Sequence, residues 1–125
     1  MTVAVRLAVG VLLVAHGLVH LLFVANDVPE FTFENSWLLP GTARRTIGPA
    51  LMAATIGAFA LAGLAVWGVP GLAGNWSALT IVGAVLSLAL LVAFWHTQMA
   101  FGVAIDLTLI ALAVLRPGWL TDRIG

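Results

Sequence analysis

Long uncharged apolar stretches dominate the chain, and they restrict it to very few kinds of fold. Residues 7–25 run for 19 residues without a full charge, and residues 77–105 contain no Asp, Glu, Lys or Arg. A helix needs about 20 apolar residues to cross a bilayer, so both stretches are long enough to span one. Only 8% of the 125 residues are charged, against about 25% in a typical soluble domain. The sequence therefore predicts an integral membrane protein.

Four spans follow from the positions of charges and turn residues, at about residues 5–25, 47–69, 76–95 and 99–115. A long loop, residues 26–46, joins the first two spans. Only His96-Thr97-Gln98 separates the last two, and a tight turn is expected there because a fused helix would be too long for one crossing. The predicted fold is all-α, a single domain forming a transmembrane four-helix bundle with up-down-up-down topology.

The charges also bear on location and orientation. An even number of spans puts both termini on one side of the membrane, together with Arg6, Arg116 and Arg123, while Arg44 and Arg45 lie on the other side. The excess of arginine favours cytoplasmic termini. All basic residues are Arg, and Ala, Gly, Val and Leu dominate, which indicates a bacterial protein and therefore the plasma (inner) membrane. The net charge of zero gives no indication of nucleic acid as a partner.

A few polar residues interrupt the apolar spans. His16 and His20 lie four residues apart, on one face of a helix. Asp106 lies inside the fourth span, where a carboxylate costs roughly 2.5–3.5 kcal/mol and must be neutral, paired or in a wet cavity. Its candidate partners are the histidines and the arginines. The topology places most of these groups in the leaflet of the long loop, with His16 near the midplane. The predicted site residues are His16, His20, Arg44, His96, Gln98 and Asp106.

Each of these side chains has more than one interpretation. Asp106 either bonds the fourth helix to the first or serves a ligand or a proton. His16 and His20 either join helices, or bond a proton or quinone, or bind a metal or haem. Metal ranks last because no Glu follows His16, so the HExxH pattern is absent. Arg44 is either an anchor at the membrane edge or an anion contact near a helix N-terminus.

Small residues indicate where helices approach each other. Four alanines recur at intervals of four residues in the second span, at Ala50, Ala54, Ala58 and Ala62. In lipid, small residues at this spacing let helix backbones pack closely. The alternative is that alanine merely fills the span in an alanine-rich composition. The absence of cysteine excludes disulfides and thiolate chemistry.

Several residues form a pattern that is similar to that of a known family. They are the stretch His16-Gly17-Leu18-Val19-His20-Leu21-Leu22, Ser87, Trp95, Phe101-Gly102 and Asp106. In this pattern the chain resembles the DoxX-like superfamily of small four-helix bacterial membrane proteins, and also uncharacterised actinobacterial proteins of this type. The resemblance implies a four-helix bundle with a redox- or lipid-associated function. The cysteine pair of the related quinone-reducing thiol enzymes is absent.

Three hypotheses for function remain. The first is a one-sided polar pocket of His, Asp and Arg that binds a small amphipathic molecule such as a quinone or a lipid headgroup, within a larger membrane complex. The second is a structural accessory subunit in which the same residues only hold helices together. The third is a proton-coupled, homo-oligomeric transporter. The sequence identifies no reaction, so whether the protein is an enzyme stays open.

Overall fold

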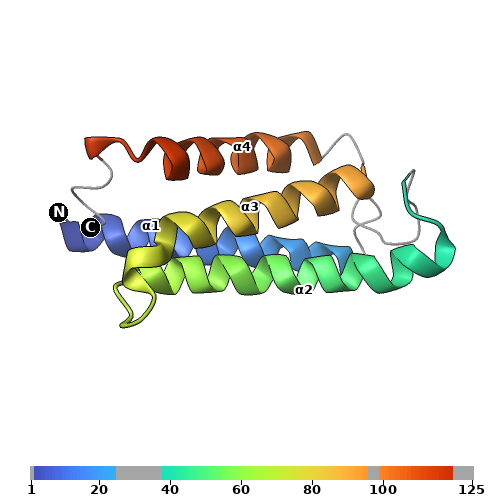
Figure 1. Cartoon of the computed structure of the whole chain (residues 1–125), viewed down its shortest axis with the longest axis horizontal. Coiled ribbons are helices and arrows are strands. Elements are labelled where there is room, and N and C mark those ends of the chain that lie inside the picture. The colour runs from blue at the N-terminus through green and yellow to red at the C-terminus, as the bar shows by residue number, and fades with distance from the viewer. Residues whose placement is uncertain (1, 25–37, 96–98, 120–125) are drawn as a thin grey trace.

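The computed structural model describes residues 2–24, 38–95 and 99–119, and these form helices with no strand among them. The elements are α1 (Thr2–Leu18), the short 3₁₀ helix η1 (Val19–Val24), α2 (Gly41–Val66), the 3₁₀ turn η2 (Ala73–Asn75), α3 (Trp76–Ala93) and α4 (Met99–Leu115). Consecutive α-helices run in opposite directions, so α1 begins and α4 ends at the same end of the molecule (Figure 1). The predicted all-α, up-down-up-down four-helix bundle is confirmed.

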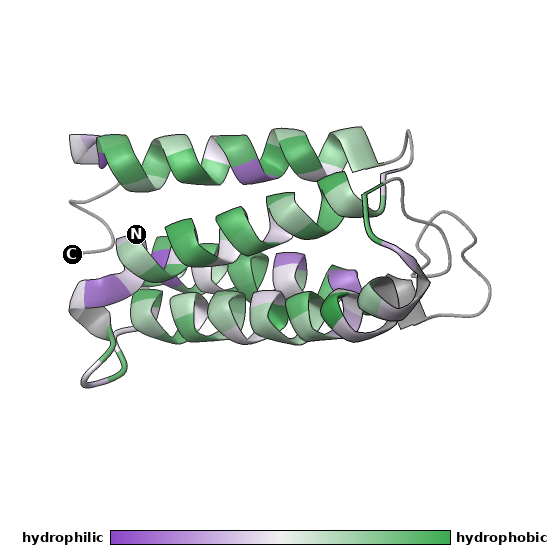
Figure 2. Cartoon of the chain, turned by 45° about the vertical axis from the view of Figure 1, so that its right-hand side comes forward, coloured by the Kyte–Doolittle hydropathy of each residue, from purple (hydrophilic) through white to green (hydrophobic). Residues whose placement is uncertain are grey.

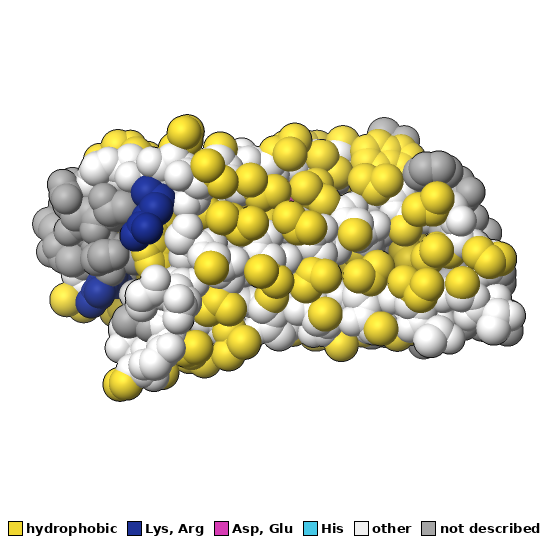
Figure 3. All heavy atoms as spheres, viewed as in Figure 1, with side chains coloured by type: hydrophobic (Ala, Val, Ile, Leu, Met, Phe, Trp, Pro, Cys, Tyr) yellow, Lys and Arg dark blue, Asp and Glu magenta, His cyan; other side chains and the backbone are white. Residues whose placement is uncertain are grey.

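The helices have the length and composition of membrane spans. Val3–Leu21, Thr46–Val66 and Trp76–Ala93 are each long and apolar enough to cross a bilayer, and α4 is an apolar helix of 17 residues. Hydrophobic residues predominate along all four helices (Figure 2), and hydrophobic side chains are spread along the length of the face seen in Figure 3. Large apolar side chains point outward, as with Phe101, which is 74% exposed. Such a surface is matched by lipid rather than by water.

The second helix begins earlier than its predicted span. The structure starts α2 at Gly41, directly after the extended Pro40 (φ −70°, ψ 167°), whereas the sequence analysis extends the long loop to residue 46. Arg44 therefore lies on the first turns of α2 rather than in a loop. The charge of Arg44 limits the length of the apolar span but does not prevent helix formation. Arginine is a good helix former, and its long side chain can reach the water at the edge of a membrane. Pro49, inside α2, removes one backbone hydrogen bond without ending the helix.

The four helices pack in chain order. α1 packs along α2, α2 along α3 and α3 along α4, whereas α1 and α4 share no extended contact among the described residues. Glycines let α1 approach α2, since a Cβ atom added at Gly63 would lie 2.9 Å from the carbonyl oxygen of Gly10. Of the alanine stripe, Ala58 and Ala62 are buried, while the other two members are exposed. The bundle is thus closed on three sides and open between its first and last helices.

Two apolar clusters fill the interior, and the polar side chains lie between them. The cluster nearer the termini is formed by Leu13, Phe59, Ala62, Ala65, Val66, Trp76, Ala84 and Ala113. The cluster nearer the other end is formed by Leu90, Leu91, Ala93, Phe94 and Met99. The buried His20, Ser87 and Asp106 therefore form a polar layer near the middle of the bundle.

Candidate functional site

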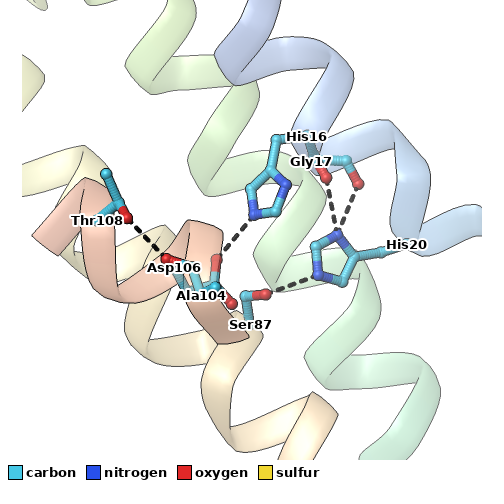
Figure 4. A network of polar contacts seen from close by, with 7 residues as sticks. All are labelled: His16, Gly17, His20, Ser87, Ala104, Asp106 and Thr108. Atoms are coloured by element: carbon cyan, nitrogen blue, oxygen red, sulfur yellow. Dashed lines mark hydrogen bonds and ion pairs between the residues drawn. The ribbon is translucent and has the colours of Figure 1, made fainter. Parts of the chain in front are cut away.

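A hydrogen bond joins α1 to α4 across the open side of the bundle. His16 Nε2 lies 2.8 Å from Asp106 Oδ1, and the Asp106 side chain is completely buried. Figure 4 shows the two side chains pointing toward each other from their helices. Because α1 and α4 lack an extended packing contact, this polar pair is a principal direct link between them. It also supplies Asp106 with the partner that a carboxylate in a membrane span requires.

A second hydrogen bond joins α1 to α3. His20 Nδ1 lies 3.0 Å from the carbonyl oxygen of His16 and 3.1 Å from that of Gly17. Carbonyl oxygens only accept hydrogen bonds, so Nδ1 is assigned as the protonated nitrogen. His20 Nε2 then accepts a hydrogen bond from the Ser87 hydroxyl at 2.8 Å (Figure 4). Both nitrogens of His20 are thus occupied, at the point where α1 tightens into η1.

Phe59 of α2 holds the two histidine rings in place. Its ring meets His16 edge to face, with centroids 4.9 Å apart, and lies nearly parallel to His20 at 6.5 Å. Phe59 is fully buried. Two glycines leave room for it, because a Cβ atom at Gly17 would lie 2.8 Å from Phe59 Cβ and one at Gly83 would lie 3.2 Å from its ring. The apolar ring thereby fixes the orientation of both imidazoles.

Two buried polar atoms have no hydrogen-bond partner in the described part of the chain. They are Asp106 Oδ2 and Trp76 Nε1. Buried polar atoms are nearly always paired in folded proteins, so such atoms mark places where a further partner fits. Among the described residues, no group of three His, Asp or Glu side chains is arranged to hold a metal ion.

A groove of about 610 Å³ lies between α1 and α4. It is lined by Val9, Leu12, Leu13, Ala15, His16, Val19, Trp76, Thr80, Ile105, Leu109, Leu112 and Trp119. The lining is almost entirely apolar, and its inner end is at His16, Val19 and Ile105. Leu12 is 68% exposed, so the groove opens sideways onto the outer surface of the bundle. A molecule entering it would come from the lipid.

A smaller cavity of about 170 Å³ lies on the other side of His16, toward the end of the bundle that holds the start of α4. It is lined by His16, Val19, His20, Leu91, Met99, Phe101, Gly102 and Ile105. His16, Val19 and Ile105 border both hollows. The His16–Asp106 pair therefore lies where the large groove meets the small cavity.

Two tryptophans line the groove at the end of the bundle that holds the termini, and an arginine lies next to one of them. Trp76 begins α3 and is buried, whereas Trp119 is 60% exposed. Arg116 ends α4 in the left-handed conformation (φ 45°), and its guanidinium carbon lies 5.8 Å from the centroid of the Trp76 ring. Proline follows Arg116 and prevents the helix from continuing.

The structure brings together only part of the predicted site. His16, His20 and Asp106 lie in one layer, and His16 is the partner of Asp106 among the candidates from the sequence. The Arg44 side chain, His96 and Gln98 lie outside the described residues. Ser87, which was not among the predicted site residues, bonds His20, and Phe59 and Trp76 are further site residues. No sequence signal distinguished Phe59, because an apolar ring in an apolar span has no unusual property.

No family model, no curated protein and no solved structure matches the chain. The function is therefore inferred from the geometry of the groove and of the polar layer.

Proposed function

We propose that this small polytopic membrane protein holds an amphipathic molecule, such as a lipid or a quinone, in the groove between α1 and α4. The observation that carries the proposal is an apolar groove of about 610 Å³ that reaches His16, the hydrogen-bond partner of the buried Asp106. Ligand cavities in proteins measure about 300–1,000 Å³ and combine an apolar lining with a few polar groups. The groove has both properties.

The shape of the groove suits an elongated apolar chain. Its lining extends along α1 from Val9 to Val19, about ten residues or ~15 Å at the rise of a helix. The exposed Leu12 and Ala15 lie along its opening, so a chain can enter sideways from the bilayer. Two helices that packed against each other along their whole length would leave no groove of this size between them.

The polar layer gives the groove a defined inner end. His16 borders the groove, and Asp106 keeps one oxygen without a partner in the described chain. A bound molecule would therefore meet His16, and Asp106, which is completely buried and does not line the groove, would act through its hydrogen bond to His16. His20 has both nitrogens engaged by the protein, so it acts by holding α1 against α3 rather than by binding. The proposal thus assigns His20 a supporting role, whereas the sequence analysis placed it among the binding residues.

Native mass spectrometry of the protein released from its own membranes tests this function. Ala15→Phe places a ring in the groove, and Ala53→Phe places the same ring on an exposed site of α2 outside the groove. We expect an adduct of a few hundred daltons on the wild type and on Ala53→Phe, and its loss from Ala15→Phe. An adduct that is absent from all three proteins, or retained equally by all three, would overturn the proposal.

A structural accessory subunit is the second candidate, and the pairing of the polar side chains favours it. His16 bonds α4 and His20 bonds α3, so both histidines of α1 join helices. Under this hypothesis, gentle solubilisation releases the chain together with larger subunits and without a small adduct. Release of the chain alone with an adduct would exclude it.

The other predictions from the sequence concern transport, the family resemblance and the location of the protein. The described cavities are mainly apolar and offer no continuous polar path that would favour a proton-coupled transporter. The resemblance to DoxX-like proteins and the location in a bacterial inner membrane with cytoplasmic termini stay predictions. The proposed function includes no reaction.

A further inference from the structure

The outer end of the groove carries a positive charge. Asp106 is the one acidic side chain among the described residues, and it pairs with His16 far from this end. The exposed Arg116 therefore has no carboxylate partner in the described part of the chain. Its guanidinium lies over the ring of Trp76, 5.8 Å from the centroid, and Trp76 lines the groove, so this contact holds the charge next to a lining residue.

A buried hydrogen-bond donor lies at the same place. Trp76 lines the groove, is only 4% exposed, and its Nε1 has no acceptor among the described residues. An indole N–H only donates, so a partner must supply an acceptor oxygen. The cation of Arg116 and the donor of Trp76 together match an anionic group that is rich in oxygen, such as a phosphate diester.

The depth of the groove matches one leaflet of a membrane. The groove extends for ~15 Å from Val9 to Val19, and half of the hydrocarbon core of a bilayer is also about 15 Å thick. Trp76 and Trp119 mark its outer end, where tryptophan normally lies at headgroup level. A chain anchored at headgroup level and filling this depth would thus end near His16 and Val19.

We infer that the groove is a site for an anionic phospholipid of the leaflet nearer the termini, with one acyl chain between α1 and α4 and its phosphate beside Arg116 and Trp76. The inference rests on the proposed function and adds the class and the direction of the ligand. An uncharged quinone head would form no ion pair with Arg116, whereas a phosphate can bind the Arg116 cation and accept a hydrogen bond from Trp76 Nε1.

Titration of the purified full chain with phosphatidylglycerol and with phosphatidylcholine, followed by native mass spectrometry, tests the charge preference. The variant Arg116→Gln removes the cation, and Arg6→Gln is its matched control. Arg6 lies at the same end of the bundle, near Gly68, whereas Arg116 lies over the ring of Trp76, which lines the groove. One arginine near anionic lipid contributes a factor of about five in affinity. We expect Arg116→Gln to weaken phosphatidylglycerol binding about fivefold and leave phosphatidylcholine binding unchanged.

The outcomes separate this inference from the proposed function. If both lipids bind the wild type equally and Ala15→Phe abolishes both, the groove binds amphiphiles but the anionic class is wrong. If Arg6→Gln weakens phosphatidylglycerol binding as much as Arg116→Gln, the preference comes from general surface charge and the inference is overturned. If Ala15→Phe changes nothing, the proposed function fails as well. Circular dichroism verifies that each variant is folded.

Spin-labelled phosphatidylglycerol tests the direction of the chain. A nitroxide at the end of the acyl chain should broaden the imidazole NMR signals of His16. A nitroxide on the headgroup should instead broaden the indole N–H signal of Trp76, which Trp76→Phe identifies. The reverse pattern would overturn the proposed direction, and broadening of neither signal would overturn the site.

Discussion

A single hydrogen bond lowers the free-energy cost of placing the Asp106 carboxylate inside a membrane span. A carboxylate within a membrane span costs roughly 2.5–3.5 kcal/mol, and Asp106 is completely buried. His16 Nε2 at 2.8 Å gives it a partner, and that partner lies on α1, which otherwise shares no extended packing contact with α4. The His16–Asp106 pair therefore lowers the free-energy cost of burying the carboxylate and connects α1 to α4.

Replacing His16 and replacing Asp106 should lower the free energy of unfolding by different amounts. His16→Leu leaves Asp106 buried with neither oxygen paired, so we expect a loss of about 3 kcal/mol in the free energy of unfolding. Asp106→Leu leaves only His16, whose side chain is 11% exposed, so the loss should be smaller. The double variant should recover most of the stability, because an apolar pair needs no partner.

Reversible unfolding in mixed micelles, followed by circular dichroism, measures these differences. A double variant as unstable as His16→Leu would contradict the account of the pair, as would a His16→Leu protein as stable as the wild type.

The hydroxyl of Ser87 gives a second prediction for single residues. Ser87→Ala removes the donor to His20 Nε2 and should lower the free energy of unfolding by about 1 kcal/mol, a usual value for a hydrogen bond between membrane helices. Thr108→Ala is the control, because the Thr108 hydroxyl is exposed and bonds the carbonyl oxygen of Ala104 in its own helix. The same unfolding assay should give the control the stability of the wild type. Equal losses in the two variants would argue against a special role of the His20–Ser87 bond.

Helices α1 and α2 approach each other through glycine rather than through the regular alanine stripe. Gly63 of α2 faces Gly10 and Val14 of α1, and a Cβ atom there would lie 2.6 Å from Val14 Cγ2. A real side chain essentially never tolerates this distance, so the two backbones are as close as glycine allows. Close approach replaces the hydrophobic effect as a source of helix association in lipid.

Matched glycine substitutions test this contact between elements. Gly63→Ala should destabilise the bundle by about 1–3 kcal/mol, because the added methyl group overpacks the helix contact. Gly57→Ala, in the same helix, would meet nothing within 4 Å, and should be neutral or stabilising by up to about 1 kcal/mol through its higher helix propensity. Thermal unfolding of both variants in detergent gives the comparison. Equal effects would mean that the close contact contributes nothing specific.

The topology of the whole molecule places the start of α1, the turn before α3 and the end of α4 at one end (Figure 1). The other end holds the start of α2. The chain contains no cysteine, so single cysteines can be introduced without removing others. Asn75, Gly118 and Thr42 are exposed sites near these two ends.

Labelling of these sites in intact cells with a membrane-impermeant maleimide tests the topology and the predicted orientation. With cytoplasmic termini, Thr42→Cys should react, while Asn75→Cys and Gly118→Cys should react only after the membrane is opened. The reverse pattern would keep the topology and invert the orientation. Reaction of Asn75→Cys and Gly118→Cys from different sides would contradict the up-down-up-down arrangement.

Part of the site followed from the sequence for local reasons. His16 and His20 share a helix face because of their spacing, and Asp106 needs a partner because of its depth, so a histidine of the first helix was a reasonable partner. Ser87 and Phe59 could not be selected in the same way. Their roles depend on how α2 and α3 are rotated about their axes, and many serine and phenylalanine positions satisfy the same local pattern.

The sequence by itself determined the membrane environment, the all-α class and the number of helices, because apolar length and charge spacing are local properties of the chain. Only the tertiary structure decided that α1 and α4 stay apart and that an apolar groove ends at His16. These two helices lie at opposite ends of the chain, and no local pattern fixes their distance. It follows from the glycine contacts that draw α1 toward α2 and from the His16–Asp106 pair that joins α1 to α4.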